Sequence, residues 1–357
     1  MGITPGVLSR YSAAAKMPQA DLCCPIDYDQ RLLKLLPQEI IDKDYGCGDP
    51  SRYVREGDVV LDLGSGGGKI CYMAAQIVGN KGQVIGIDMN DDMLGLARRY
   101  QAEMARKLGG DRVRFVKGYI QDLALDLDAA DANQPQQKTS RPLIADASVD
   151  LVISNCVLNL VGEADRAQMI REIARVLRPG GRVAISDIVS DEAVPEELKL
   201  DGDLWSGCIS GAFQEQDFLK AFVDAGFLAV GFDKWDASPW RVVHGIEFRS
   251  VTLIAVKGLG SSCLDYGHAV IYRGPFSSVA DDEGHVFPRG ERMAVCERTF
   301  RFLMQGPLKN DFIGITPAIP RDPPTPWCVP AGARRVPAET KAGSYNTDCC
   351  SGGSCCK

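Results

Sequence analysis

Hydrophobic and polar positions between residues 58 and 258 follow two alternating patterns. Short apolar runs that end at a glycine or an acid are typical of buried strands, and longer segments with apolar residues every three or four positions are typical of helices. The expected strands are residues 58–64, 83–88, 112–118, 149–155, 181–189, 227–235 and 247–258. The expected helices are residues 69–78, 91–108, 164–177 and 214–226. Strands that alternate with helices predict an α/β fold, with a mostly parallel seven-stranded sheet and helices on both faces.

Segments of different composition predict how the chain is organised around this core. We expect four parts: an N-terminal cover (1–57), the core (58–258), a small C-terminal domain or appendage (259–330) and a flexible cysteine-rich tail (331–357). The cover opens with a short polar lead, and its residues 29–41 have apolar side chains at helical spacing that Pro37 interrupts. The last part ends in DCCSGGSCCK, a low-complexity sequence typical of a mobile chain end.

Charge and hydropathy exclude several classes of protein. The 357 residues include 40 Lys and Arg against 47 Asp and Glu, and the net charge of −7 argues against a broad nucleic-acid-binding surface. No apolar run reaches the ~18 residues that a membrane-spanning helix needs, so no membrane partner is expected. The first residues lack the apolar core of a secretory signal, which predicts a cytoplasmic, reducing location.

The clearest motif is VVLDLGSGGGK at residues 59–69, directly between an expected strand and an expected helix. Asp62, Gly64, Gly66 and Gly68 form the pattern D-x-G-x-G-x-G, and glycines let a backbone turn tightly and approach a ligand closely. Asp88 ends the next strand, where an acid can accept both hydroxyl protons of a ribose. A glycine-rich turn without a ligand is the alternative, and the ordered set of loop, second acid and parallel sheet disfavours it.

This combination resembles the class I S-adenosylmethionine-dependent methyltransferases, a Rossmann-like family. The segment RVLRPGGRVAISD and the two last expected strands also resemble that family. The resemblance implies S-adenosyl-L-methionine as methyl donor. It also implies a set of donor-binding residues: Asp62 and the loop glycines beside the methionine portion, Asp88 at the ribose, Met89, Ile120 and Gln121 at the adenine, and Asn155 at the reacting centre.

The 13 cysteines are the unusual feature of the composition. Their number is odd, no CxxC occurs and the three histidines are far apart, so a standard structural zinc site is disfavoured. Cys47 precedes the core, Cys156 follows the fourth strand, and Cys208 follows the fifth strand, so three segments can each bring one thiol to a methyl donor. Three soft thiolates suit a thiophilic centre, and no catalytic metal is expected. The alternative is that each is a small buried hydrophobe, which is our interpretation of Cys71.

Around these cysteines the chain is similar to the arsenite methyltransferases, in YGCGDP, VLDLGSGGGKICYMA, ISNCVLNL and GCISGA. The resemblance implies that Cys47, Cys156 and Cys208 bind trivalent arsenic, with arsenite or methylarsenite as substrate and detoxification as the outcome. It also implies disulfide exchange at the Cys23–Cys24 doublet, where many members have a single cysteine. Cys23 or Cys24 with Cys47 is then the candidate redox pair, and thioredoxin or glutathione the candidate reductant.

Two other functions remain open at this point. A small-molecule C- or O-methyltransferase would use Asn155 and the acids near Asp187, and its cysteines would be structural. A protein that sequesters soft ions through thiols would keep the cofactor fold as a vestige and use the cysteine-rich tail. We interpret Asp187, Asp191 and Glu192, which follow the fifth strand, as solvated loop charges.

Overall fold

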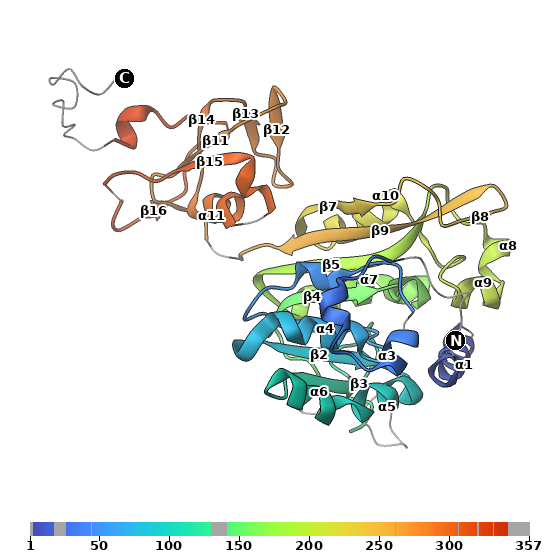
Figure 1. The fold of residues 1–357 in the computed structure, drawn as a ribbon. Coiled ribbons are helices and arrows are strands. Elements are labelled where there is room, and N and C mark those ends of the chain that lie inside the picture. The colour runs from blue at the N-terminus through green and yellow to red at the C-terminus, as the bar shows by residue number, and fades with distance from the viewer. Residues whose placement is uncertain are drawn as a thin grey trace, which may run out of the picture. The chain divides into compact units, whose positions relative to one another are not determined.

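The computed structural model divides into two compact units, Met1–Gly258 and Leu259–Lys357, which Figure 1 shows as ribbons. It describes residues 3–17, 26–43, 45–129, 141–260, 262–305, 307–319, 321–330 and 332–341. We call the first the methyl-donor unit, because it contains the glycine motif, and the second the C-terminal unit.

A nine-stranded sheet forms the centre of the methyl-donor unit. Its main path runs β3-β2-β1-β4-β5-β9-β7, and the short strands β6 and β8 pair with β5 and β9. The strands are β1 (Val59–Leu63), β2 (Gln83–Asp88), β3 (Val113–Lys117), β4 (Val149–Asn155), β5 (Leu177–Ser190), β6 (Phe213–Gln214), β7 (Phe227–Trp235), β8 (Arg241–Val243) and β9 (Ile246–Lys257). Pairs from β3 to β5 are parallel, and β9 is antiparallel to both of its main neighbours. The predicted mostly parallel seven-stranded sheet is confirmed along this main path.

Helices cover both faces of the sheet (Figure 1). The long ones are α4 (Lys69–Val78), α5 (Asp91–Arg99), α6 (Gln101–Leu108), α7 (Glu163–Val176) and α10 (Glu215–Asp224). Successive residues of β1 point to opposite faces, so Leu61 and Leu63 join the core cluster with α7 and α10, while Val60 joins the cluster with α4 and α5. One expected helix, 91–108, is two helices in the structure, separated at Tyr100.

The N-terminal segment differs from its prediction. The expected polar lead is largely a helix, α1 (Ile3–Lys16), with Val7, Ala14 and Ala15 buried. The Arg10 guanidinium donates to the Asp203 carbonyl at 2.8 Å, and so holds α1 against α9 (Gly202–Ser206), which follows α8 (Glu196–Lys199). The following helices α2 (Gln30–Leu33) and α3 (Gln38–Asp42) are interrupted at Pro37, as the sequence predicts. Short 3-10 turns are Pro50–Tyr53, Gly79–Lys81 and Leu158–Leu160.

In its described residues, the C-terminal unit has small antiparallel sheets and one α-helix. Its elements are β10 (Leu264–Asp265), β11 (Ala269–Tyr272), β12 (Ser278–Ala280), β13 (Val286–Pro288), β14 (Arg292–Ala294), α11 (Glu297–Gln305), β15 (Phe312–Ile315) and β16 (Thr325–Pro326), with 3-10 turns at Pro307–Asn310 and Pro337–Glu339. Buried Arg335 forms an ion pair with Asp265 at 2.8 Å. The packed part of this unit therefore extends beyond residue 330, where we expected the flexible tail to begin.

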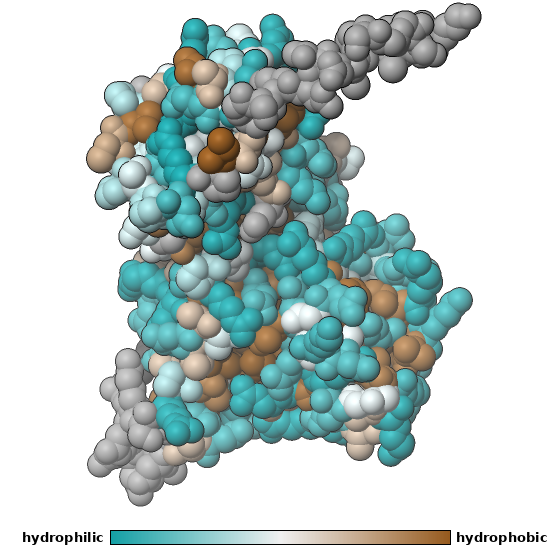
Figure 2. Space-filling model, turned by 90° about the vertical axis from the view of Figure 1, so that its left-hand side faces the viewer, coloured by the Kyte–Doolittle hydropathy of each residue, from teal (hydrophilic) through white to brown (hydrophobic). Residues whose placement is uncertain are grey.

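Figure 2 shows one face, on which hydrophilic residues predominate and hydrophobic residues are scattered among them. In the described ranges, no helix has the length and apolar character that crossing a membrane requires.

Candidate functional site

The glycine motif forms the turn between β1 and α4. The N–H groups of Gly64 and Ser65 donate to the Ile87 carbonyl at the end of β2, at 2.8 and 2.9 Å. Gly64, Gly66 and Gly68 have φ angles of 68°, 51° and 85°, in the left-handed region that glycine adopts without steric cost. A Cβ at Gly64 would overlap Val157, and one at Gly68 would overlap Phe115. This turn therefore requires glycine at the predicted positions.

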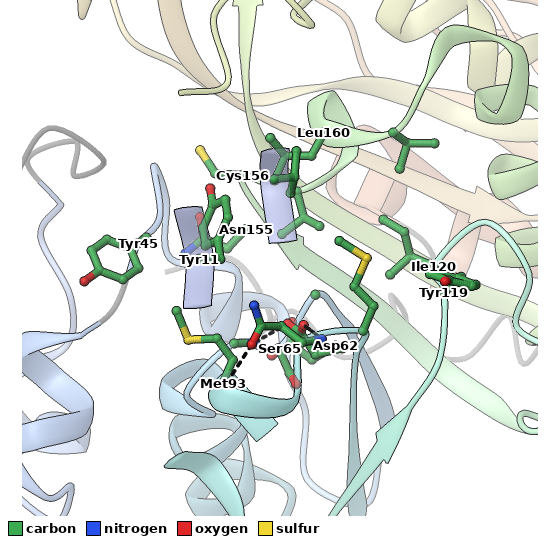
Figure 3. Close-up of a pocket in the computed structure, with 18 of the residues that line it drawn as sticks. Tyr11, Tyr45, Asp62, Ser65, Met93, Tyr119, Ile120, Asn155, Cys156 and Leu160 are labelled. Carbon is green, nitrogen blue, oxygen red and sulfur yellow. Dashed lines mark hydrogen bonds between the residues drawn. The ribbon is translucent and has the colours of Figure 1, made fainter. Parts of the chain in front are cut away.

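A cavity of about 310 Å³ lies at the carboxyl ends of β1, β2 and β4. Of the residues that we predicted to bind the donor, all except Gly68 line it. Gly68 packs behind the loop, and Gly67 lines the cavity instead. Figure 3 shows Asp62 and Ser65 on one side, Tyr119 and Ile120 on another, and Asn155 and Cys156 close to Tyr11.

The polar groups of this cavity fit a nucleoside. Asp88 accepts N–H groups from Gly66 at 2.8 Å and Asn90 at 2.9 Å, one on each carboxylate oxygen, which leaves a lone pair on each for a ribose hydroxyl. Burial raises the pKa of Asp88, and those backbone N–H groups oppose the shift. The Ser65 hydroxyl is buried and has no hydrogen-bond partner among the described residues, so a polar ligand group would satisfy it.

Helix α1 supplies further lining residues, which the sequence analysis missed. Val7, Leu8 and Tyr11 face the cavity, and the Asn90 amide, which caps α5, also donates to the Leu8 carbonyl at 3.2 Å. Val7, Tyr11, Ala14 and Ala15 follow a helical period that could have revealed this helix. Because α1 closes one side of the cavity, it excludes water from whatever binds there.

Three predicted thiol residues meet beside the cavity. Cys47, Cys156 and Cys208 belong to one buried cluster, and Cys156 also lines the cavity. Cys47 and Cys156 are joined by a disulfide with a Cα–Cα distance of 5.9 Å, whereas our candidate partner for Cys47 was Cys23 or Cys24. The Cys208 thiol donates to the Cys156 carbonyl at 3.3 Å and hydrogen-bonds to the Tyr11 hydroxyl.

The backbone at two of these cysteines is strained. Cys156 and Cys208 have φ angles of 58° and 61°, which residues with a side chain rarely adopt. Such conformations persist where surrounding structure enforces them, and they are frequent at functional sites. At the third cysteine, Ser250 donates to the Cys47 carbonyl at 2.6 Å, and the amide of Asn155 contacts the same segment. All three thiol positions are therefore held by tertiary contacts.

Asp187 contradicts our interpretation of it as a solvated loop charge. It lies within β5, is 1% exposed, and accepts N–H groups from Leu158 at 2.9 Å and Ile188 at 2.8 Å. Burial raises its pKa to about 7, against the effect of these N–H groups. One of its oxygens lies within 4.8 Å of the sulfurs of Cys47 and Cys156. Asp187 stands among apolar residues within the strand expected at 181–189, and this local signal could have predicted its burial, whereas Glu192 follows that strand and is exposed as expected.

The remaining cysteines separate into distinct groups. Cys71 is buried as expected, and its thiol donates to Asp62 at 3.2 Å. Cys23, Cys24 and the four tail cysteines lie outside the described residues. Cys263, Cys296 and Cys328 belong to the C-terminal unit.

A glycine turn, a ribose-type acid and a cavity at the carboxyl ends of parallel strands define a class I S-adenosylmethionine-dependent methyltransferase. In agreement, a family model described as a methyltransferase domain matches residues 55–226. The arsenite methyltransferase of Aquipseudomonas alcaligenes is 35% identical over 76% of this chain and 77% of its own, and that of Homo sapiens is 30% identical over 79% and 73%. The chain belongs to the arsenite methyltransferase family.

A solved structure supports the same assignment. The arsenic (III) S-adenosylmethionine methyltransferase of Chlamydomonas reinhardtii is 29% identical, with a TM-score of 0.57, and the match covers 84% of this chain and 99% of that one. A second family model matches residues 260–345 and is described only as a domain of unknown function. The two family models thus cover both units but describe an activity for the first alone.

Proposed function

We propose that this chain transfers a methyl group from S-adenosylmethionine to trivalent arsenic held by the thiolates of Cys47, Cys156 and Cys208. The observation that carries the proposal is that thiols from three distant segments converge at a cavity suited to the donor. Trivalent arsenic takes three thiolates in a pyramid and keeps a lone pair. That lone pair is the nucleophile, so the protein needs to supply position rather than a general base.

The donor contributes a methyl group on a positively charged sulfonium. In our proposal, Asp88 binds the ribose of the donor, and the glycine turn lets the donor lie close to the backbone. The α1 residues Val7 and Tyr11 exclude water. Dehydration strengthens the attraction between the sulfonium and the acids that line the cavity, Asp62 among them. The site thereby favours attack by arsenic over hydrolysis.

The redox state of the thiols is part of the proposed cycle. The Cys47–Cys156 disulfide must be reduced to two thiolates before both can bind arsenic. Methyl transfer raises arsenic from the trivalent to the pentavalent state. Two thiolates then give up two electrons, which returns the arsenic to the trivalent state and joins the two sulfurs in a disulfide. Thioredoxin or glutathione, as a thiol reductant, would then reopen the pair, with Cys23 or Cys24 as candidate exchange partner.

Product speciation over time tests the proposal. Reduced protein with arsenite, S-adenosylmethionine and thiol should form methylarsenicals, and Cys47→Ser, Cys156→Ser and Cys208→Ser should each lower the rate by at least about a hundredfold. Cys328→Ser, an exposed cysteine of the C-terminal unit, is the matched control and should retain the wild-type rate. A Cys156→Ser protein that still methylates arsenite would contradict the assignment. Activity on a carbon or oxygen acceptor, unaffected by Cys156→Ser, would favour the alternative methyltransferase.

The biological role that we propose is arsenic detoxification. Expression in an arsenite-sensitive bacterium should raise the arsenite concentration that permits growth, and the Cys156→Ser variant at equal abundance should not.

A further inference from the structure

Helix α1 contacts both parts of the proposed site, and the proposed methyl transfer does not use its Arg10. Three residues of α1 line the donor cavity, Val7, Leu8 and Tyr11. Arg10 of the same helix reaches Asp203 of α9, 193 positions further along the chain. Helix α9 leads directly into residues 205–208, which we call the Cys208 turn. One helix therefore lies between the donor cavity and one of the three thiols.

Hydrogen bonds join α1 to the turn after β2, which carries the proposed ribose ligand. The Asn90 amide donates to the Leu8 carbonyl at 3.2 Å and to the Ser12 hydroxyl at 3.1 Å. Asn90 is buried, and its backbone N–H donates to the Asp88 carboxylate at 2.9 Å. The position of α1 therefore depends on the same turn that a bound donor would contact.

Arg10 joins α1 to the Cys208 turn. Its guanidinium donates to the Asp203 carbonyl at 2.8 Å and to the Ser206 hydroxyl at 2.6 Å. A Cβ at Gly207 would lie 3.8 Å from a nitrogen of Arg10, so the guanidinium also packs against the residue before Cys208. Hydrogen bonds from a charged donor are stronger than those between neutral groups, which makes this connection a firm one.

The Cys208 turn needs contacts from outside itself. The φ angle of 61° at Cys208 is one that residues with a side chain rarely adopt, and such conformations persist where surrounding structure enforces them. The Gly207 N–H donates to the Asp203 carbonyl at 3.0 Å. Because that carbonyl also accepts the Arg10 guanidinium, the position of α1 acts on the turn that directs the Cys208 thiol.

We propose that Arg10 is a positioning residue that couples donor binding to arsenic binding. A donor that packs against α1 holds the Cys208 turn, through Arg10, in the conformation that binds arsenic. Coupling between two sites is reciprocal, so each ligand should strengthen the binding of the other by the same factor, here about tenfold. The inference rests on the proposed role of Cys208 in arsenic binding, while its effect on the turn itself needs only the donor.

The alternative is that Arg10 merely stabilises the fold. In that case its loss would weaken arsenite binding by one factor, whether or not a donor analogue is bound. If Arg10 couples the sites, its loss makes the affinity for arsenite independent of the analogue. The ratio of the two affinities therefore separates a positioning role from a structural one.

Equilibrium dialysis measures this ratio. Full-length protein, reduced with a phosphine and then freed of it without oxygen, is dialysed against arsenite with and without saturating S-adenosylhomocysteine, which lacks the transferable methyl group. The wild type should bind arsenite about tenfold more tightly with the analogue. Arg10→Met, with an unbranched apolar side chain, should show less than about a twofold difference. Arg106→Met, which replaces an exposed arginine of α6, is the matched control and should keep the wild-type ratio.

A second measurement needs no arsenic. While the Cys47–Cys156 disulfide is intact, Cys208 is a free thiol. A pulse of N-ethylmaleimide, followed by peptide mass spectrometry, reports how readily the Cys208 turn opens. S-adenosylhomocysteine should slow alkylation of Cys208 at least about fivefold in the wild type and less than about twofold in Arg10→Met. Direct shielding of the thiol by the analogue would persist in the variant, and that result would overturn the proposal.

The remaining outcomes are also decisive. Ser206→Ala, which removes one of the two acceptors of Arg10, replaces Arg10→Met if thermal unfolding shows that the latter is not folded, and it should reduce both effects to less than about half. An arsenite affinity that the analogue leaves unchanged in the wild type, or a ratio that survives loss of Arg10, would overturn the proposal. Methylation of arsenite is measured with the same wild-type preparation. Its absence would contradict the proposed function, whereas normal methylation without coupling would contradict this inference alone.

Discussion

The side-chain oxygen of Asn155 accepts the backbone N–H of Cys47 at 2.9 Å, and also that of Gly48 at 3.1 Å. The Asn155 amide nitrogen returns a hydrogen bond to the Gly48 carbonyl at 2.9 Å. Asn155 is the last residue of β4, so the end of the central sheet directly positions the thiol segment of the N-terminal cover. We predicted Asn155 to face the reacting centre; it lines the cavity, and its polar atoms position Cys47.

Asn155→Ala should therefore destabilise the protein and release the Cys47 segment from the end of β4. It leaves two buried N–H groups and a carbonyl without partners, and at about 1–3 kcal/mol for an unsatisfied group we expect a loss of about 2–4 kcal/mol in the free energy of unfolding. Urea unfolding and methylarsenical production measure the two effects. Asn310→Ala, on the exposed surface, is the control. Wild-type stability and rate in Asn155→Ala would show that other contacts suffice to hold Cys47.

Gly46→Ala should disturb the same junction from the other side. A Cβ at Gly46 would overlap the Asn155 amide, so the variant must displace that amide from its hydrogen bonds. Overpacking of this kind costs about 1–3 kcal/mol. Gly95→Ala is the matched control, because Gly95 lies within α5 with open space at its Cβ and alanine there should stabilise by about 0.5–1 kcal/mol. Equal melting temperatures for the two variants would argue against a tight junction at Gly46.

The sheet and its long helices were predictable because each element carries its own period. The expected strands 83–88, 149–155 and 227–235 agree with β2, β4 and β7 to the residue. Helix α1 was missed because its buried face is short, with Val7, Ala14 and Ala15 buried. The break of the helix at Tyr100 has no equally visible cause, since neither proline nor an unfavourable turn residue stands there.

Site residues could be predicted only where the order of strands and loops places them at one edge of the sheet. Asp62 lies near the end of β1, Asp88 ends β2, and Cys156 follows β4, and such carboxyl ends meet at one edge of a parallel sheet. The burial of Asp187 depends instead on the segment after β4, which folds over it and donates the Leu158 N–H. The pairing of Cys47 with Cys156, 109 residues apart, likewise depends on how the cover packs. The Leu158 hydrogen bond and the disulfide arise from tertiary structure and leave no local pattern, although the apolar neighbours of Asp187 in the expected strand do indicate burial.

Tyr11→Phe should weaken the handling of arsenic more than that of the donor. The variant keeps the ring that lines the cavity and loses only the hydroxyl that hydrogen-bonds to the Cys208 thiol. A lost hydrogen bond of about 1–1.5 kcal/mol corresponds to a KM for arsenite raised about tenfold, with the KM for S-adenosylmethionine little changed. Tyr45→Phe is the control, because Tyr45 also lines the cavity and its hydroxyl donates to the Ala14 carbonyl at 3.0 Å. Equal effects in both variants, or an effect on the donor alone, would contradict this role.

Asp187 should make stability depend on pH in the window between about 4 and 7. Burial raises the pKa of Asp187 to about 7 in the folded protein, whereas an exposed Asp side chain, as in the unfolded chain, has a pKa of 3.8. Between these two pH values the folded protein therefore holds a proton that the unfolded chain has released. Its contribution to stability is therefore fully present below about pH 4 and is lost as the pH rises towards 7. The corresponding slope is at most ~1.4 kcal/mol of unfolding free energy lost per pH unit. Asp187→Asn cannot release this proton and should lack that part of the slope.

Urea unfolding at half-unit steps from pH 3.5 to 8, with the Cys47–Cys156 disulfide intact, measures the difference between wild type and Asp187→Asn. The two curves of unfolding free energy should run parallel below about pH 4, where both side chains at position 187 are neutral, and this range is the internal control. Between pH 4 and 7 the wild type should fall relative to the variant, and above about pH 8 the curves should again run parallel. Parallel curves throughout would mean that Asp187 titrates alike in the folded and unfolded chain, and that burial beside Cys47 and Cys156 does not hold its proton.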